Sequence, residues 1–337
     1  MQTNLKKTQI GNTGVEVTTI GMGGAPIGKG DLDTAVDSLE TAYKKGIRYF
    51  DTAPLYGTGQ SEIYYGKFLP TIDRDDFTLS TKVGRLILSE DEASKYSYPE
   101  SVNLESDAFN NNKRSAGYKN QVVFNYSKDG ILRSIDESLS RLGLDRIDIV
   151  HIHDPDDFYE QALNETFPTL ADLKSQGVIK AIGAGMNEWE MLSEFAKNAD
   201  FDCFLLAGRY TLLDHSALHE LMPLCEEKDI SLILGGPYNS GILASDLDAD
   251  TTYFYESSPQ KVVQKAKDIK KICDRYNVPL KAAALQFGLN HPAVATTIPG
   301  PTDANELEEN INMATLDINP DMWRDLKQEG LIHQDCP

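Results

Sequence analysis

Residues 127–153 read SKDGILRSIDESLSRLGLDRIDIVHIH and contain one full unit of the pattern that predicts the fold. A helical pattern runs from Ser127 to Leu142 and ends at Gly143, and an apolar, β-branched run follows from Ile147 to His153. Near-continuous hydrophobic runs are typical of parallel strands that are buried on both faces. The stretch therefore predicts a helix that leads into a buried parallel strand.

The same alternation extends along the chain in both directions. The apolar runs are Val17–Gly21, Ile47–Asp51, Phe77–Lys82, Ile147–His153, Ile179–Ala184, Cys203–Ala207, Ile230–Gly235 and Val294–Ile298. Helical patterns between them include Asp33–Lys45, Ser61–Leu69, Ser127–Leu142, Asp214–Lys228 and Pro259–Tyr276. Eight strands with helical crossovers predict an α/β protein whose strands close into a (β/α)8 TIM barrel.

An open, doubly wound sheet is the alternative α/β architecture. It requires a GxGxxG turn between the first strand and a helix. Residues 21–26 read GMGGAP, and they lead into Pro26 and a loop instead of a helix. The dinucleotide fingerprint therefore fails in its context, and the closed barrel is favoured.

The chain length and charge limit the function. The 337 residues contain no repeat or Pro/Gly-rich linker, which predicts one barrel domain over residues 1–337. With 32 basic and 52 acidic residues the net charge is −20, which argues against nucleic acid and anionic membranes as partners, because both attract basic patches. A solvated acidic surface explains the charge without further function, although adaptation to a saline medium is open.

The cysteines and the N-terminal residues indicate a cytoplasmic protein. Cys203, Cys225 and Cys273 are expected as small core residues of a reducing compartment, and Cys336 forms no CxxC pair with them. The lysines at positions 6 and 7 precede no apolar signal region, and no stretch approaches the ~18 apolar residues of a membrane span.

Two long polar segments interrupt the alternation, after the third and the seventh predicted strands. Residues 85–124 carry Tyr96, Tyr98, Phe109 and Tyr118, and residues 243–258 carry Tyr253, Phe254 and Tyr255. Long loops in compact domains are usually functional or disordered. Because both loops would lie over the C-terminal mouth of the barrel, their aromatic side chains predict a lid over a substrate.

Side chains of four chemical types stand at the ends of three predicted strands. Asp51 ends the second strand and Tyr56 lies in the following turn, Lys82 ends the third, and His151 and His153 share one face of the fourth. In a parallel barrel these ends meet at the mouth, where active sites of this fold lie. Each residue alone is more often a local hydrogen-bonding group, but the combination predicts one active site.

The combination suits proton transfer at a carbonyl or alcohol oxygen. A free tyrosine has a pKa near about 10, and a neighbouring ammonium favours its phenolate. Lys82 can supply that charge, Asp51 can hold Lys82, and an imidazole can orient the substrate oxygen. Since the sequence has no metal-ligand cluster and no nucleophile elbow, we expect no metal, and we expect the redox electrons to come from an organic cofactor.

Residues 50–62, FDTAPLYGTGQSE, resemble the signature of the aldo-keto reductase family. The resemblance extends from GNTG at 11–14 to EN at 309–310. Residues 127–134, 141–146, 153–155 and 207–210 are similar to its branch of aldose 1-dehydrogenases, which includes L-fucose, D-threo-aldose and L-galactose dehydrogenases and a pyridoxal 4-dehydrogenase.

The resemblance implies a TIM barrel without a Rossmann domain and a catalytic tetrad. The tetrad carries over as Asp51, Tyr56, Lys82 and a histidine of the fourth strand. Counting five residues on from Asp148 assigns that role to His153. His151 points the same way but deeper, and it is expected to be a packed interior histidine.

The resemblance also implies a nicotinamide cofactor, whose adenine end would meet residues 298–310. Members that prefer NADP carry Lys at the position of Gly300 and Arg at that of Glu306, where they hold the 2′-phosphate. A carboxylate repels phosphate and accepts hydrogen bonds from a free ribose diol, so NAD is expected over NADP. Glu306 could instead be only a first-turn acid at a helix start. Glu309 and Asn310 match positions at which members of the family contact the adenine.

Residues 235–241, GGPYNSG, follow the seventh strand, and such small residues with exposed amides can cradle a pyrophosphate. By resemblance the cofactor-binding positions on and near this turn are Gly236, Tyr238, Asn239 and Ser240, with Asn187 a candidate for the carboxamide. Two positions depart from many relatives, because Gly235 replaces an aromatic residue that stacks on the nicotinamide and Ala207 replaces a glutamine.

The leading hypothesis is an NAD-linked oxidation of an aldose, of the L-fucose, D-arabinose or L-galactose type, at C1 to its lactone. Oxidation of pyridoxal to pyridoxolactone is a parallel alternative, because the substrate is again a cyclic hemiacetal. General aldehyde or ketone reduction with NADPH is a third, against which Gly300 and Glu306 argue. A regulatory nicotinamide-binding subunit is the non-enzyme alternative. The particular sugar and the oligomeric state stay open.

Overall fold

A computed structural model describes residues 5–97, 120–247, 251–254 and 256–336. Eight parallel strands form one sheet, in the order β14-β11-β10-β9-β8-β5-β4-β3. They are β3 (Met22–Gly23), β4 (Tyr49–Asp51), β5 (Thr78–Val83), β8 (Ile149–His153), β9 (Ala181–Met186), β10 (Cys203–Ala207), β11 (Ser231–Gly235) and β14 (Val294–Ile298). A parallel bridge between Ile20 and Thr297, with the Gly21 N–H donating to the Thr297 carbonyl at 2.9 Å, joins the two ends. The predicted (β/α)8 barrel is confirmed.

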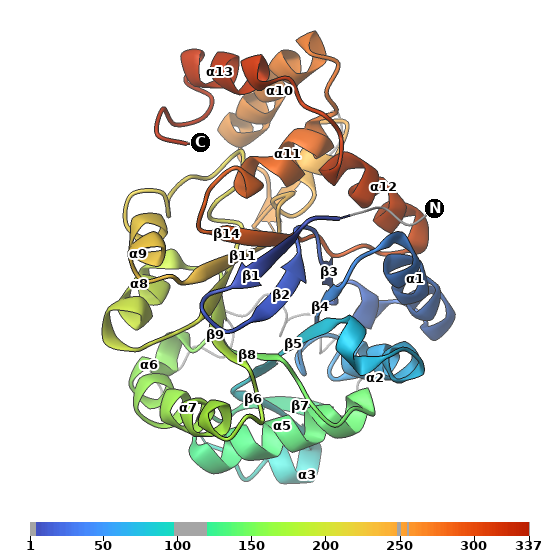
Figure 1. Ribbon diagram of the computed structural model, residues 1–337, viewed down its shortest axis with the longest axis vertical. Helices are drawn as coiled ribbons and strands as arrows, with labels where there is room; N and C mark the ends of the chain where they lie inside the picture. Colours follow the sequence, from blue (N-terminus) through green and yellow to red (C-terminus); the bar gives the residue numbers. More distant parts are fainter. Residues whose placement is uncertain (1–4, 98–119, 248–250, 255, 337) are drawn as a thin grey trace.

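Helices surround this barrel as an outer ring (Figure 1). The longer ones are α1 (Leu32–Lys45), α2 (Gln60–Phe68), α5 (Lys128–Leu142), α7 (Phe167–Ser175), α8 (Trp189–Asn198), α9 (Leu221–Glu227), α10 (Gln260–Arg275), α11 (Leu280–Leu289), α12 (Ala304–Ala314) and α13 (Pro320–Gln328). Helix α5 begins where the Ser127 side chain accepts the Gly130 N–H, and it ends at Gly143 in the left-handed conformation. Local capping therefore sets the helix bounds expected from the sequence.

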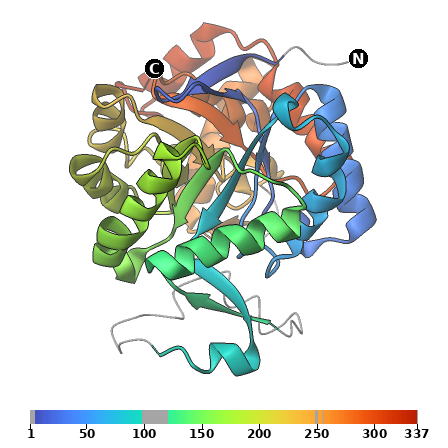
Figure 2. The same ribbon diagram turned by 60° about the horizontal axis from the view of Figure 1, so that its bottom comes forward.

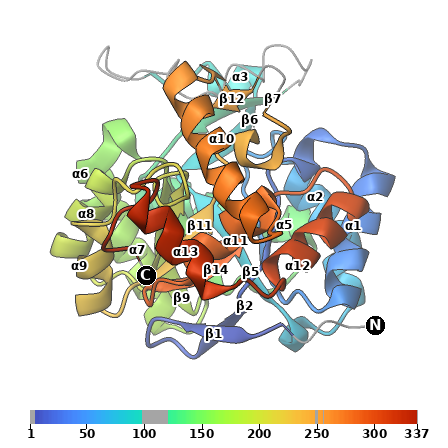
Figure 3. The same cartoon turned by 90° about the horizontal axis from the view of Figure 1, so that it is seen from above.

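The first barrel strand is not where the sequence places it. Val15–Thr18 forms β2, which pairs antiparallel with β1 (Lys7–Ile10), and the barrel strand is the shorter β3. The β1–β2 hairpin lies at the end of the barrel opposite β6, β7 and β12 (Figure 3). Val17 packs there against Tyr49 and other interior residues. The prediction is wrong because Val17 and Thr18 of β2 are buried, as the residues of a barrel strand are, although β2 lies outside the barrel sheet.

The helix predicted at Asp214–Lys228 is also too long. Only α9, from Leu221 to Glu227, is helical. In the preceding residues the Thr211 hydroxyl accepts the Asp214 N–H at 3.1 Å, and the Asp214 carboxylate accepts the Ser216 N–H at 2.8 Å. Such side chain–backbone bonds compete with helical ones and favour turns.

The two long loops contain strands of their own. Within residues 85–124, β6 (Arg85–Ser89) pairs antiparallel with β7 (Asn120–Phe124), and α3 (Glu90–Ala93) follows β6. This hairpin projects from the barrel (Figure 2). The second loop contains a 3-10 turn (Ile242–Ala244) and the short pair β12 (Thr252–Tyr253) and β13 (Glu256–Ser257). The aromatic residues Tyr98, Phe109, Tyr118 and Tyr255 lie outside the described residues.

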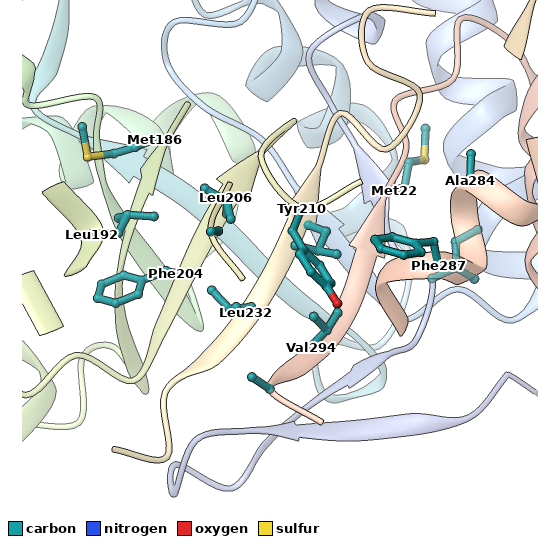
Figure 4. Close-up of a cluster of buried hydrophobic side chains, with 14 of the residues drawn as sticks. Met22, Met186, Leu192, Phe204, Leu206, Tyr210, Leu232, Ala284, Phe287 and Val294 are labelled. Atoms are coloured by element: carbon teal, nitrogen blue, oxygen red, sulfur yellow. The ribbon is translucent and has the colours of Figure 1, made fainter. Parts of the chain in front are cut away.

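The main core fills the space between the barrel and its helices. Side chains of β10, β11 and β14 pack there against α8 and α11, as Phe204, Leu206, Leu232 and Phe287 illustrate (Figure 4). All four cysteines are buried and free. Among the described residues no helix has the length and apolar character to cross a membrane.

Candidate active site

A buried ion pair joins the ends of β4 and β5. The Lys82 Nζ atom donates to the two Asp51 carboxylate oxygens at 2.9 and 2.8 Å, and to the Thr52 carbonyl at 2.9 Å. The Ser80 hydroxyl donates to Asp51 Oδ1 at 2.7 Å. Both charged side chains are at most 2% exposed. The Lys82 ammonium of β5 is therefore held by short contacts with Asp51 and Thr52 at the end of the neighbouring strand β4.

Tyr56 and His153 complete the predicted tetrad. Lys82 Nζ lies 4.6 Å from the centroid of the Tyr56 ring, and the rings of Tyr56 and His153 meet edge to face with centroids 5.9 Å apart. The turn that carries Tyr56 requires Gly57, since a Cβ there would lie 2.0 Å from the Gly28 carbonyl oxygen. The structure thus brings all four side chains together, as the strand ends predict.

His151 lies two residues before His153 on β8 and is fully buried. Neither of its ring nitrogens has a hydrogen-bond partner among the described residues. Burial, and then the charge of Lys82, holds the pKa of His151 well below its ordinary value. It is therefore a neutral interior imidazole beneath the tetrad, in agreement with the expectation from the sequence.

The tetrad opens into a cavity of 360 Å³ at the C-terminal mouth of the barrel. Seven of the predicted cofactor residues line the same cavity: Asn187, Gly236, Tyr238, Asn239, Ser240, Gly300 and Glu306. Asn310 lies behind it, where its Oδ1 atom accepts the Tyr238 hydroxyl at 2.6 Å. Glu309 is turned to Lys281, with which it forms an ion pair at 2.6 Å.

This end of the cavity has the features that a dinucleotide needs. Asn239 Oδ1 and Asn310 Nδ2 are buried and have no hydrogen-bond partner among the described residues. Gly235 and Gly236 also line the cavity, so backbone without a side chain faces the ligand space there. Unpartnered buried amides are costly unless a ligand satisfies them, so the residues present fit a nicotinamide dinucleotide.

Glu306 has two roles in the structure. It lines the cavity, and its carboxylate also accepts the Thr302 N–H and hydroxyl, each at 2.8 Å. The Asp303 side chain accepts the Glu306 N–H at 2.9 Å and caps α12, so Glu306 belongs to the contacts that fix the start of this helix. Burial, and then the charges of Glu306 and Glu309, raises the pKa of the neighbouring Tyr238. Both interpretations of Glu306 that the sequence allows are therefore compatible with its position.

Further residues of the cavity wall were not named as catalytic or cofactor-binding residues from the sequence. Asp154 lines it directly after His153, and its signals in the sequence were its place at a strand end and the resemblance of residues 153–155. Phe254, one of the loop aromatics predicted to cover a substrate, lines it as well. The guanidinium carbon of Arg209 lies over the Phe254 ring, 3.8 Å from its centroid. Residues 23–26 line it as well, although they fail as a dinucleotide fingerprint. A group of potential metal ligands, His219, His333 and Asp335, lies on the surface and does not line the cavity.

The fold and the tetrad define an oxidoreductase barrel, and comparison with known proteins agrees. The model of the Aldo/keto reductase family matches residues 19–329, and the chain belongs to this family. It is thus an oxidoreductase of a family that uses NAD or NADP.

Curated relatives cover almost the whole chain. A pyridoxal 4-dehydrogenase of Microbacterium luteolum is 36% identical, over 97% of this chain and 98% of its own. A D-threo-aldose 1-dehydrogenase of a Pseudomonas species is also 36% identical, over 95% of this chain and 96% of its own. An NADH-specific methylglyoxal reductase of Escherichia coli is 28% identical, over 94% of both chains.

A solved structure shares the fold. The aldo-keto reductase AKR11C1 of Bacillus halodurans, in its holo form, superposes with a TM-score of 0.74 at 24% identity, over 97% of this chain and 96% of its own. At this identity the likeness concerns the fold alone.

Proposed function

We propose that this protein oxidises the cyclic hemiacetal form of an aldose at C1 to the lactone, with NAD as the hydride acceptor. The observation that carries the proposal is the Lys82 ammonium, held by Asp51 and placed 4.6 Å from the Tyr56 ring, at the floor of a cavity that also fits a dinucleotide. The D-threo-aldose 1-dehydrogenase relative, at 36% identity, supports the substrate class.

Each residue of the tetrad has a separate role in the proton transfer. The Lys82 charge favours the phenolate of Tyr56, which accepts the proton of the C1 hydroxyl, and Asp51 keeps the ammonium in place. His153 orients the substrate oxygen toward Tyr56, since the two rings are in edge-to-face contact. A nicotinamide, when bound, would supply the hydride acceptor: C1 would lose its hydrogen as hydride, the C1 hydroxyl would lose its proton to Tyr56, and the C1–O bond would become the lactone carbonyl.

The NAD preference rests on the adenine end of the cavity. Gly300 and Glu306 line it where a 2′-phosphate would need cations, and a carboxylate there repels phosphate. The methylglyoxal reductase relative is named as NADH-specific, which agrees with this choice. The cytoplasmic location stays a prediction.

Pyridoxal is the second candidate substrate, because the pyridoxal 4-dehydrogenase relative is also 36% identical. Pyridoxal forms a cyclic hemiacetal through its own hydroxymethyl group, so the same proton and hydride transfers would give pyridoxolactone. General aldehyde reduction and a regulatory subunit are supported by no observation of comparable weight.

A substrate panel tests the proposal. L-fucose, L-galactose, D-arabinose and pyridoxal are each incubated with NAD and with NADP, and turnover is followed at the nicotinamide absorbance with the lactone identified by mass. We expect lactone from at least one aldose, with NAD preferred. Turnover of pyridoxal alone would move the assignment to the second candidate, and cofactor binding without any turnover would favour a regulatory subunit.

A further inference from the structure

Asp154 is a carboxylate at the catalytic end of the cavity that the proposed reaction does not use. It follows His153 directly, lines the cavity, and its side chain is 18% exposed. Its Oδ2 atom lies 3.5 Å from His153 Nε2. The Asp154 carboxylate therefore lies beside His153, the residue that is proposed to orient the substrate oxygen.

The fold holds this residue in a conformation that is unfavourable for a side chain other than glycine. Its φ angle is +39°, in the left-handed region. Its N–H donates to the Gly185 carbonyl at 3.0 Å, and its own carbonyl accepts the Tyr126 hydroxyl at 2.9 Å. Strained residues of this kind persist where surrounding contacts fix them, and they concentrate at ligand sites.

A second, buried side chain fixes the carboxylate itself. Arg85 Nη2 donates to Asp154 Oδ2 at 3.1 Å, and the Arg85 side chain is only 3% exposed. The guanidinium also lies over the ring of Phe124, 4.9 Å from its centroid. Arg85 and Phe124 are paired residues at the base of the β6–β7 hairpin, so this projecting segment reaches the active site through Arg85.

We propose that the Asp154 carboxylate accepts a hydrogen bond from a substrate hydroxyl next to the reacting carbon. The positive charge of Arg85 offsets that of the carboxylate, so the pair suits a neutral hydroxyl better than a cation. The Asp154 side chain is 18% exposed and lines the cavity, so a substrate hydroxyl in the cavity can approach its carboxylate. This inference rests on the proposed function and names the substrate class more closely: a hydroxylated carbonyl compound or its hemiacetal.

Two three-carbon aldehydes test the inference whether or not the protein forms lactones. D-glyceraldehyde and propanal differ by two hydroxyls, and the reduction of each with NADH is measured for the wild type and for Asp154→Asn. We expect the wild type to prefer glyceraldehyde, and the variant to lose about 10-fold to 100-fold of that preference, mainly through KM. Turnover of propanal and the dissociation constant of NADH should change less than about threefold.

Controls separate recognition from other roles. Asp157→Asn removes an exposed carboxylate from the same loop and should leave the preference unchanged. Arg85→Lys keeps the charge but not the planar guanidinium, and it should lose part of the preference. An equal loss for both aldehydes with an altered pH profile would overturn the inference and assign Asp154 to the positioning of His153. An unchanged preference would overturn it too. Absence of lactone from every aldose of the panel would instead count against the proposed function.

Discussion

The two ends of the cavity are built differently. At the catalytic end, Asp51 and Lys82 are at most 2% exposed, and the Lys82 ammonium donates two hydrogen bonds to Asp51 and a third to the Thr52 carbonyl. At the adenine end, Glu309 is half exposed and Glu306 contacts residues of its own helix start. The first end is fixed by the barrel strands, whereas the second depends on local contacts that other side chains could replace. Substitutions should therefore affect rate and folding at one end and cofactor choice at the other.

The largest effect is expected at Tyr56. In Tyr56→Phe the cavity keeps its shape but loses the group that accepts the proton, so kcat/KM should fall about 10³-fold. NAD affinity, measured by fluorescence titration, should stay within about twofold of the wild type.

Tyr159→Phe is the control for this substitution, since that tyrosine lies on α6 (Tyr159–Gln161) and not in the cavity wall. Wild-type turnover in Tyr56→Phe would show that the substrate proton leaves by another route. The catalytic end of the cavity would then not determine the rate, in contrast to what is expected here.

The second effect concerns folding at the catalytic end. Asp51→Ala leaves the Lys82 ammonium buried without its counterion, which should lower the free energy of unfolding by about 3–5 kcal/mol. The double variant Asp51→Ala/Lys82→Met removes both charges and should recover much of that loss, while remaining inactive. Urea unfolding curves of both variants provide the comparison. Equal destabilisation in the two variants would mean that packing, and not the charge, fixes this end.

A smaller effect is expected at the adenine end. Glu306→Arg replaces the carboxylate with the cation that a 2′-phosphate needs, and the ratio of kcat/KM for NADP to that for NAD should rise about 10-fold. Loss of the contacts with Thr302 should cost about 1 kcal/mol of stability. Glu308→Arg is the matched control, because Glu308 is on the same helix but pairs with Lys45. The same ratio in both variants would remove Glu306 from cofactor selection.

The smallest effect is a pH dependence beneath the tetrad. Because burial lowers the pKa of His151, the unfolded chain binds a proton below about pH 6.5 that the folded protein does not bind. Stability is therefore lost as pH falls below that value, and His215, whose pKa burial lowers to about 4, acts in the same direction. In His151→Leu the free energy of unfolding should fall less steeply between about pH 6.5 and pH 4.5, by up to about 1.4 kcal/mol per pH unit.

Chemical unfolding at several pH values measures this slope. His219→Gln is the control, since it removes an exposed imidazole and leaves the buried ones in place. An unchanged slope in His151→Leu would show that the interior histidine takes up its proton in the folded protein as well.

The sequence predicted the catalytic end well because strand order and strand ends determine it. Asp51, Lys82 and His153 stand at the ends of strands whose parallel pairing follows from hydrophobic pattern alone, so their meeting follows from topology. Strand β2 (Val15–Thr18) could not be distinguished from a barrel strand in the sequence, because both contain buried apolar residues. The contact of Asp154 with Arg85 could not be predicted for another reason: it spans 69 positions, and no local pattern encodes it.

The bridge between Ile20 and Thr297 has a consequence for how the chain folds. It joins segments near opposite ends of the sequence, and such non-local contacts form slowly because the intervening chain must first be ordered. Until β14 arrives, the nascent sheet has two unpaired edges that another chain could pair with. Closure should therefore be a late step during synthesis, and the open seven-stranded intermediate should be the species most prone to aggregation.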